Sequence, residues 1–241
     1  MPSTLVIAEA GVNYNNFDEA MKLVEYAAFA GANAVKFQIF WGIGKELSKY
    51  ELTKEGWKQL YNCANYHAIG FMATAHWGSP LTFYKEEDYD VIDFVDSLVL
   101  VHKIASPYLT NEKYCKYIAS KGKPILLSTG SVKNKDGMAK MSEIKQALTW
   151  LKGSKVCLLH CVSKYPLKNP HYERILKLKK FGVSVGLSDH STNKMIQCWP
   201  VVEKHFKLDD NCIDSNVSLN PNEFREMVRN IRNYESMFKT R

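Results

Sequence analysis

Stretches that suit β-strands alternate with stretches of helical periodicity along the chain. The strand-like stretches are residues 4–11, 33–40, 70–76, 100–106, 123–129, 156–163, 182–190 and 200–206. Helices are expected over residues 18–29, 54–67, 142–151, 171–181 and 193–199, and two more are expected to open at Asn111 and Asn220. Thr53 and Asn220 are predicted N-caps, because their side chains can accept hydrogen bonds from the first helical turn. The stretch before residue 100 is longer than one strand needs and is expected to hold helix and loop.

This alternation predicts the class of fold. Eight strands separated by helices in 241 residues suit a single domain, residues 1–241, folded as a (β/α)8 TIM barrel. A doubly wound open sheet is the alternative. It is disfavoured because no G-x-G-x-x-G turn follows the first strand.

Composition limits the partners and the compartment. There is no basic and apolar leader and no apolar run long enough to cross a bilayer, so we expect a cytoplasmic protein without a membrane partner. The net charge of +7 is spread along the chain, which suits a small anionic substrate better than a nucleic acid. The six cysteines form no C-x-x-C pair and are expected to be reduced.

The last two predicted strands carry polar residues on one face. In residues 182–190, Ser188 and His190 lie on the face opposite Val185 and Leu187, and in residues 200–206, Glu203 and His205 share a face. If the two strands are neighbours, one metal ion could bridge His190 and His205. The alternative is that each histidine only forms a hydrogen bond near a strand end.

In a barrel of this kind, reactive groups gather at the C-terminal ends of the strands. Besides the last two strands, the candidates are Glu9, Asn13, Lys36, Gln38, Lys103, Ser106, Ser128, Thr129, His160, Ser163 and Tyr165. A lysine on an inward face is costly unless it is paired or holds an anion. Lys36 and Lys103 therefore indicate a phosphate or carboxylate site, or structural salt bridges to Glu9 or Glu203. Imidazoles with oxygen ligands suit Mn²⁺ or Mg²⁺ better than a thiolate-bound zinc.

The sequence resembles a family over nearly its whole length. The stretches that carry the likeness are IAEAGVNYN, AVKFQIF, KIASPYLTN, PILLSTGS, LLHCVSKYP, VGLSDHS, VVEKHF and SLNPNEFREMVRNIR. They resemble the sialic acid (N-acetylneuraminate) synthases, whose members condense phosphoenolpyruvate with an amino sugar. The resemblance implies the same metal-dependent reaction on N-acetylmannosamine or a similar sugar. Mn²⁺ is the expected metal, with Mg²⁺ and Co²⁺ as alternatives.

The resemblance also implies roles for individual residues. His190 and His205 would be the metal ligands, and Glu9, Glu203 and Asp214 would lie where family members hold the metal-bound water or the acceptor sugar. Glu203 is the candidate for proton transfer at the aldehyde oxygen or the water. The residues expected around phosphoenolpyruvate are Lys36, Lys103, Ser106, Ser128 and Ser188, with Ser163 and Tyr165 close by.

Several positions depart from the family pattern on the sugar side. Tyr14 and Asn16 stand where the family usually has His and Gly, and Pro107 and Tyr108 follow Ser106 where Gly and an acidic residue are usual. The third strand ends in ATAHW instead of a Thr-Pro-Phe-type ending. After the last helix we expect no counterpart of the family's C-terminal antifreeze-like domain, which reaches over a partner's active site.

Two functions are therefore weighed. The first is an active phosphoenolpyruvate-dependent synthase, and the second is a catalytically silent barrel that acts as a binding or assembly subunit. The expected partners are the two small-molecule substrates and either a second copy of the chain or a separate protein that supplies a lid. A lid formed by residues 84–100 of the same chain is the other possibility.

Overall fold

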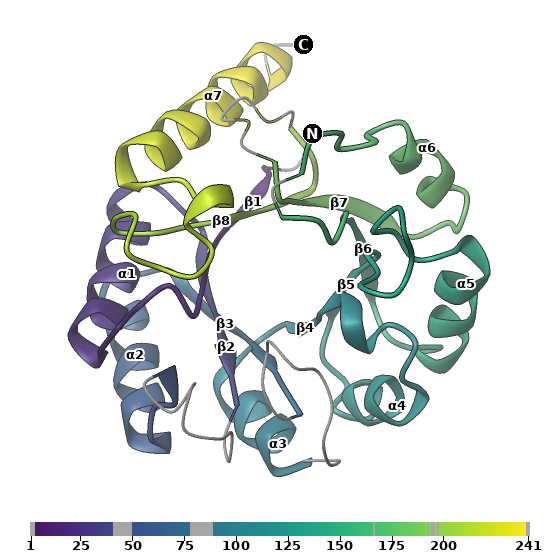
Figure 1. Cartoon of the computed structure of the whole chain (residues 1–241), viewed down its shortest axis with the longest axis horizontal. Helices are drawn as coiled ribbons and strands as arrows, with labels where there is room; N and C mark the ends of the chain where they lie inside the picture. The colour runs from purple at the N-terminus through teal and green to yellow at the C-terminus, as the bar shows by residue number, and fades with distance from the viewer. Residues whose placement is uncertain are drawn as a thin grey trace.

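A ring of eight parallel strands forms the centre of the molecule (Figure 1). The structure is a computed structural model that describes residues 3–40, 50–77, 89–165, 167–191, 193, 196 and 198–239. The strands are β1 (Leu5–Gly11), β2 (Ala34–Ile39), β3 (Gly70–Ala75), β4 (His102–Ile104), β5 (Ile125–Ser128), β6 (Val156–His160), β7 (Ser184–Asp189) and β8 (Val201–His205). They pair in the order β3-β2-β1-β8-β7-β6-β5-β4, and β3 and β4, the ends of this order, lie next to each other in Figure 1. The sheet is thus a nearly closed barrel.

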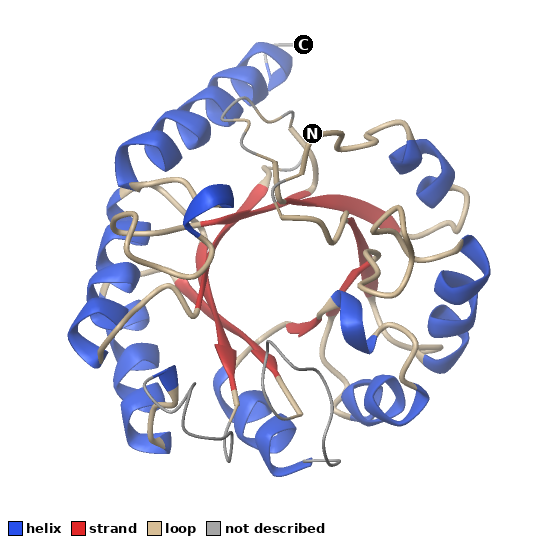
Figure 2. Ribbon diagram, viewed as in Figure 1, coloured by secondary structure: helices blue, strands red, loops and turns tan. Residues whose placement is uncertain are grey.

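The helices surround this barrel (Figure 2). They are α1 (Phe17–Phe29), α2 (Lys54–Tyr66), α3 (Tyr89–Leu98), α4 (Glu112–Ser120), α5 (Met141–Trp150), α6 (Arg174–Lys179) and α7 (Pro221–Lys239), with short 3₁₀ turns η2 (Ser106–Tyr108) and η3 (Ser215–Val217). Alternation of strands and outer helices confirms the predicted (β/α)8 TIM barrel. Among the described helices, none has both the length and the apolar character that crossing a membrane would require.

The inward faces of the strands change from apolar to polar along the barrel axis. Towards the N-terminal ends of the strands, the inward residues are apolar: Ile7, Ala34, Met72, Leu126, Leu159 and Val201. Because side chains alternate across a strand, the next inward residue lies two positions further on. These next residues are Glu9, Lys36, Thr74, Ser128, Cys161 and Glu203. An apolar layer therefore fills the barrel towards the N-terminal ends of the strands, and a polar layer lies at their C-terminal ends.

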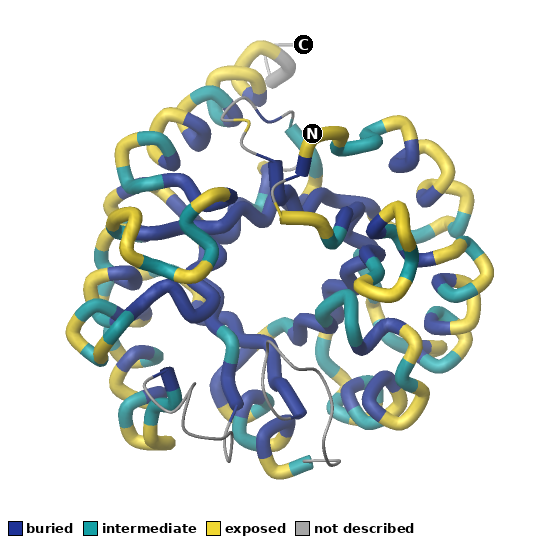
Figure 3. The backbone as a smooth tube through the Cα atoms, in the orientation of Figure 1, coloured by how far each residue is buried: buried dark blue, intermediate teal, exposed yellow. Residues whose placement is uncertain are grey.

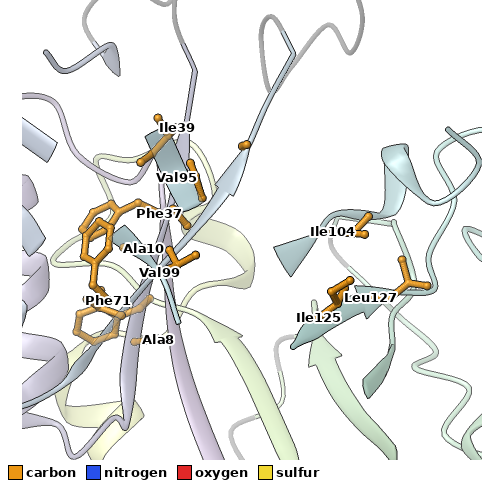
Figure 4. Packing of buried hydrophobic residues seen from close by; sticks show 14 of the residues in the cluster. Ala8, Ala10, Phe37, Ile39, Phe71, Val95, Val99, Ile104, Ile125 and Leu127 are labelled. Carbon is orange, nitrogen blue, oxygen red and sulfur yellow. The ribbon is translucent and has the colours of Figure 1, made fainter. Parts of the chain in front are cut away.

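The outward faces pack against the helices. Phe37 stacks on Phe71 with ring centroids 5.9 Å apart, and both rings lie in the large core between the strands and the helices (Figure 4). Val95 of α3 joins this core. Burial is accordingly concentrated in the strands and the inner sides of the helices, while the outer sides are exposed (Figure 3). The strands are thus closely packed on both faces, which makes the barrel wall rigid.

Four sequence expectations differ from the structure. β4 is only His102–Ile104 and α6 only Arg174–Lys179, both shorter than predicted. The helix predicted over residues 193–199 is wrong at the described positions 193, 196, 198 and 199, which are not helical; the other three residues lie outside the described part. Within residues 84–100, the described Tyr89–Leu98 forms α3, which packs on the outside of the barrel through its apolar residues. That part is therefore no lid, and residues 84–88 lie outside the described residues.

The predicted N-cap of α7 is confirmed. The side-chain oxygen of Asn220 accepts hydrogen bonds from the backbone N–H groups of Asn222 (3.0 Å) and Glu223 (3.1 Å). In return, the Glu223 carboxylate accepts from the backbone N–H of Asn220 at 3.1 Å. This reciprocal pattern is a capping box. Phe224, Val228 and Ile231 of the same helix are buried behind it.

Asn220→Ala should lower the free energy of unfolding by about 1 kcal/mol, because two N–H groups of α7 lose their acceptor. Urea denaturation followed by circular dichroism measures the change. Asn233→Ala is the matched control, since Asn233 is exposed within the same helix and alanine is the better helix former there. An equal loss in both variants would contradict a capping role.

Candidate active site

A cavity of 330 Å³ opens at the C-terminal ends of the strands. Gln38 and all the residues to which the family resemblance gives a role line it: Glu9, Lys36, Lys103, Ser106, Ser128, Ser163, Tyr165, Ser188, His190, Glu203, His205 and Asp214. The strand register explains the convergence, since Glu9 of β1 pairs with Lys36 of β2 on one side and with His205 of β8 on the other. Ser188 of β7 likewise pairs with Glu203 of β8. Neighbouring strands therefore place these side chains at one level of the barrel.

Two lysines and two glutamates form a charge network in this cavity. Lys36 forms an ion pair with Glu9 and lies 3.7 Å from the Glu203 carboxylate. Lys103 reaches the same Glu203 at 3.4 Å from the other side of the barrel. All four residues are at most 4% exposed. Buried charges of this kind are tolerated only when they are paired.

The network determines which groups are charged. Burial opposes the charge on Lys36, but Glu203 and Glu9 outweigh it and raise the lysine's pKa. Burial also opposes ionisation of Glu203, yet Lys103, Lys36 and a hydrogen bond from Ser188 lower its pKa from 4.5 to about 2. Because this pKa is lowered on folding, the stability that Glu203 contributes is present above pH 4.5 and is lost as the pH falls towards 2. Near neutral pH Lys36 is therefore a cation and Glu203 an anion.

His190 and His205 lie next to each other on the wall of the cavity. Their ring centroids are 5.1 Å apart with an angle of 68° between the planes. The ring of Tyr165 stacks on His190 at 4.4 Å, and its hydroxyl lies 3.0 Å from Nε2 of His190. The prediction that these histidines lie on adjacent strand ends and point to one face is therefore confirmed.

The surroundings of both rings fit a metal site. Nδ1 of His190 donates to the backbone carbonyl of Val162 at 2.9 Å, and Nδ1 of His205 lies 3.3 Å from the Asp214 carboxylate. Histidines that bind metals commonly direct their second nitrogen to such oxygen acceptors, which leaves Nε2 for the metal. Over the part of the chain that the structure describes, no group of three or more His, Cys, Asp or Glu side chains is arranged to hold a metal. Two imidazoles would thus need water or substrate oxygens as the remaining ligands.

Cys161 is a cavity residue that the sequence analysis treated only as a buried thiol. Its sulfur lies 3.9 Å from Nδ1 of His190 and accepts a hydrogen bond from Ser106 at 3.6 Å. Burial lowers the pKa of His190, but the neighbouring Cys161 outweighs this and raises it to about 9. The same contact lowers the pKa of Cys161 against the effect of burial. A metal ion bound at Nε2 would replace both the proton and the Tyr165 hydrogen bond there.

Asp214 enters the cavity from the loop between β8 and α7. Its backbone N–H donates to the side-chain oxygen of Asn13 at 3.1 Å, and the Asn13 amide donates to the carbonyl of Phe206 at 3.0 Å. Asn13 was predicted to be a reactive group, but these hydrogen bonds show that it anchors this loop to the barrel. Burial opposes ionisation of Asp214, whereas the nearby His205, His190 and Lys36 lower its pKa. An ionised carboxylate is therefore presented at the cavity mouth.

Two further cavity residues were missed, one on β3 and one just after it. Thr74 and His76 continue the inward face that begins at Met72, and the period of two would have identified them. Thr74 accepts a hydrogen bond from Lys36 at 3.4 Å. Burial and then the charges of Lys36 and Lys103 lower the pKa of His76 to about 3, so its imidazole is neutral. Tyr108 lies 3.3 Å from Nδ1 of this ring.

Two other candidates lie outside the cavity. Nε2 of His160 is 2.7 Å from the carbonyl of Pro170. The hydroxyl of Thr129 donates to the carbonyl of Leu159 at 3.0 Å. Both residues therefore stabilise the barrel wall, and their prediction as reactive groups is wrong.

The fold and the cavity define a (β/α)8-barrel protein with an ionised, partly basic site at the strand ends. The chain belongs to the NeuB family, whose family model matches residues 42–241.

Individual relatives agree with this assignment. An uncharacterised protein of Methanocaldococcus jannaschii is 35% identical over 97% of this chain and 72% of its own length. The N,N'-diacetyllegionaminic acid synthase of Campylobacter jejuni is 34% identical over 96% of this chain and 76% of its own. The crystal structure of the N-acetylneuraminic acid synthetase of Leptospira borgpetersenii superposes with a TM-score of 0.84 at 28% identity, over 98% of this chain and 85% of that one. The relatives thus include synthases of different sugar acids.

Ser188→Ala should raise the pKa of Glu203, because the Ser188 hydroxyl donates a 2.7 Å hydrogen bond to the ionised carboxylate. Carboxyl titration by NMR in metal-free protein measures this shift. Ser184→Ala is the control, since Ser184 lies at the exposed start of the same strand. An unchanged Glu203 titration in Ser188→Ala would mean that the lysines alone hold the carboxylate ionised.

Proposed function

We propose that this protein condenses phosphoenolpyruvate with the aldehyde of an open-chain amino sugar to give a 2-keto sugar acid and phosphate. The acceptor is N-acetylmannosamine or a similar sugar. Family membership supports the general reaction. The observation that carries the proposal is the pair of buried lysines, Lys36 and Lys103, which face each other across Glu203 among hydroxyl groups.

The lysines and hydroxyls would form the phosphoenolpyruvate site. Ammonium groups and hydroxyls are common donors to phosphate and carboxylate oxygens, and charged hydrogen bonds are the stronger ones. Ser106, Ser128 and Ser163 line the same cavity as the lysines and would complete the donor set. When the carbon–oxygen bond to phosphate breaks, fixed cations stabilise the charge of the leaving group.

The charge balance of the cavity supports a divalent metal. Two lysines and three carboxylates, Glu9, Glu203 and Asp214, line its described part, and their formal charges sum to one negative charge before the histidines are counted. The proton that His190 holds with a pKa of about 9 would only cancel this charge. A divalent cation held by His190 and His205 in place of that proton would make the sum positive, which favours an anionic substrate, and when bound it would polarise the aldehyde and position a water. Mn²⁺ is the proposed ion, with Mg²⁺ and Co²⁺ as alternatives, because imidazole and oxygen ligands suit these ions.

The reaction develops a positive charge that a carboxylate in the cavity can stabilise. A carbon–carbon bond forms between the methylene carbon of phosphoenolpyruvate and the aldehyde carbon, and positive charge develops on the carbon that bears the phosphate. Water adds to that carbon, and loss of phosphate leaves the keto acid. With a pKa of about 2, Glu203 cannot donate a proton near neutral pH and is a weak base. We therefore assign it to stabilisation of the developing cation, in place of the proton transfer expected from the sequence.

The acceptor would bind towards the cavity mouth. Asp214 and Tyr165 lie there, and Gln38 lines the wall beside Lys36. Tyr165 is 53% exposed, so its ring can contact a sugar that enters from solvent. Amide, phenol and carboxylate groups are suitable partners for sugar hydroxyls and for an N-acetyl group.

The reaction itself provides the test. Purified protein with phosphoenolpyruvate, N-acetylmannosamine and Mn²⁺ should release phosphate in equal amount to a new 2-keto acid. Release should stop when the sugar is omitted or the metal is chelated. Absence of phosphate release with this and other 2-acetamido sugars, in protein that still binds phosphoenolpyruvate, would favour a silent binding subunit.

Lys36→Met should weaken phosphoenolpyruvate binding at least about tenfold. A charge-assisted contact is worth about 1.5–3 kcal/mol, and a tenfold change in affinity is about 1.4 kcal/mol. Isothermal titration calorimetry measures the affinity, and circular dichroism checks that the variant folds. Lys58→Met, at an exposed position on α2, is the control. Unchanged affinity in folded Lys36→Met protein would remove Lys36 from the substrate site.

A further inference from the structure

A buried ion pair lies directly behind the two histidines. Nζ of Lys204 is 2.7 Å from the carboxylate of Asp189, and these side chains are 0% and 1% exposed. Lys204 lies on the outward face of β8 with Val202 and Phe206, and Asp189 on the outward face of β7 with Leu187. The neighbouring residues on these faces belong to the apolar core. A charged pair at this place therefore needs a specific explanation.

The pair joins the residues that immediately precede the histidines. Asp189 precedes His190, Lys204 precedes His205, and the register of β7 and β8 places Asp189 opposite Lys204. Because successive side chains point to opposite faces, the ion pair lies outside the barrel wall while both imidazoles lie inside. The contact thus connects the two backbone positions from which the imidazoles project.

Further hydrogen bonds hold the chain on the other side of His190. The Ser191 hydroxyl donates to Asp189 at 2.7 Å, and Lys204 donates to the backbone carbonyl of Ser191. Tyr172 adds a hydrogen bond to the second Asp189 oxygen at 3.3 Å. The residues before and after His190 are therefore both fixed to Lys204. Buried ionic groups with their hydrogen bonds satisfied in this way are rigid.

We infer that the Lys204–Asp189 pair is a positioning device that fixes the separation of the His190 and His205 imidazoles. The inference rests on the metal site of the proposed function. Two nitrogens that share one ion must keep bonds of about 2.1 Å, with a tolerance of about 0.2 Å. A buried ion pair is often no more stabilising than apolar residues of similar size. A role in orienting the two histidines therefore explains the position of the Lys204–Asp189 pair better than a contribution to stability does.

The test replaces both charges with apolar side chains in the full chain, as Asp189→Leu with Lys204→Met. Removing both partners leaves no unpaired buried charge, so the free energy of unfolding should fall less than when only one partner is replaced by an apolar residue. Affinity for Mn²⁺ alone, measured by calorimetry without substrates, should fall at least about tenfold, as is usual when groups that orient metal ligands are lost. Asp189→Asn, which nearly preserves shape, should weaken binding in the same direction and serves if the double variant does not fold. Lys123→Met, which breaks the 2.9 Å ion pair with Asp96, is a control that should not change Mn²⁺ affinity.

The outcomes separate this inference from the proposed function. If the wild-type protein binds no Mn²⁺, the metal part of the proposed function fails. A crystal structure of the folded metal-free variant then decides the positioning role. A changed separation of the two imidazoles supports it, and a retained centroid separation of 5.1 Å overturns it. If the wild-type protein binds Mn²⁺ and the folded variants bind it equally well, the metal site stands and the positioning role is wrong.

Discussion

The contact of Lys36 and Lys103 with one carboxylate, Glu203, is the constraint on which the rest of the site depends. Glu203 and Glu9 outweigh the burial that opposes the charge on Lys36, and the two lysines in turn help to keep Glu203 ionised against its own burial. The network is overall neutral when Glu9 is included. It therefore holds two cations at the cavity in advance of any substrate, and their cost of burial is already met during folding. Preorganised charge of this kind is what a reaction that releases phosphate requires.

The barrel is what brings these groups together. Lys36, Lys103 and Glu203 come from β2, β4 and β8, and the sequence separates the first and last by more than half of the chain. An apolar layer beneath them closes the barrel to water from the other end. The outer face of β7 and β8 carries the Lys204–Asp189 pair, one residue away from each histidine. Both faces of β7 and β8 thus contribute to the geometry of one site.

Periodicity predicted most of the fold and the site because strands alternate and helices have capping residues. It failed where a strand is buried on both faces. In VCLLHC, the residues on either side are apolar, so the sequence could not decide whether His160 or Cys161 points inward. Thr74 and His76 follow from the same period of two as Lys36. In GFMATAH, however, the residues around them are small or apolar on both faces, so the polar face is hard to recognise. The partners of charged residues, such as Asp189 for Lys204, depend on the register between strands, which a single sequence does not contain. For residues 84–100, the sequence did not show that the described part, Tyr89–Leu98, packs its apolar residues on the outside of the barrel.

The most direct measurement of the central claim is a crystal structure of the protein with Mn²⁺ and phosphoenolpyruvate. Our account predicts an anomalous peak within about 2.3 Å of Nε2 of both His190 and His205. It also predicts a phosphate or carboxylate oxygen within about 3 Å of Nζ of both Lys36 and Lys103. A metal bound away from the histidines, or phosphoenolpyruvate bound outside the cavity while these lysines keep only their glutamate partners, would contradict it.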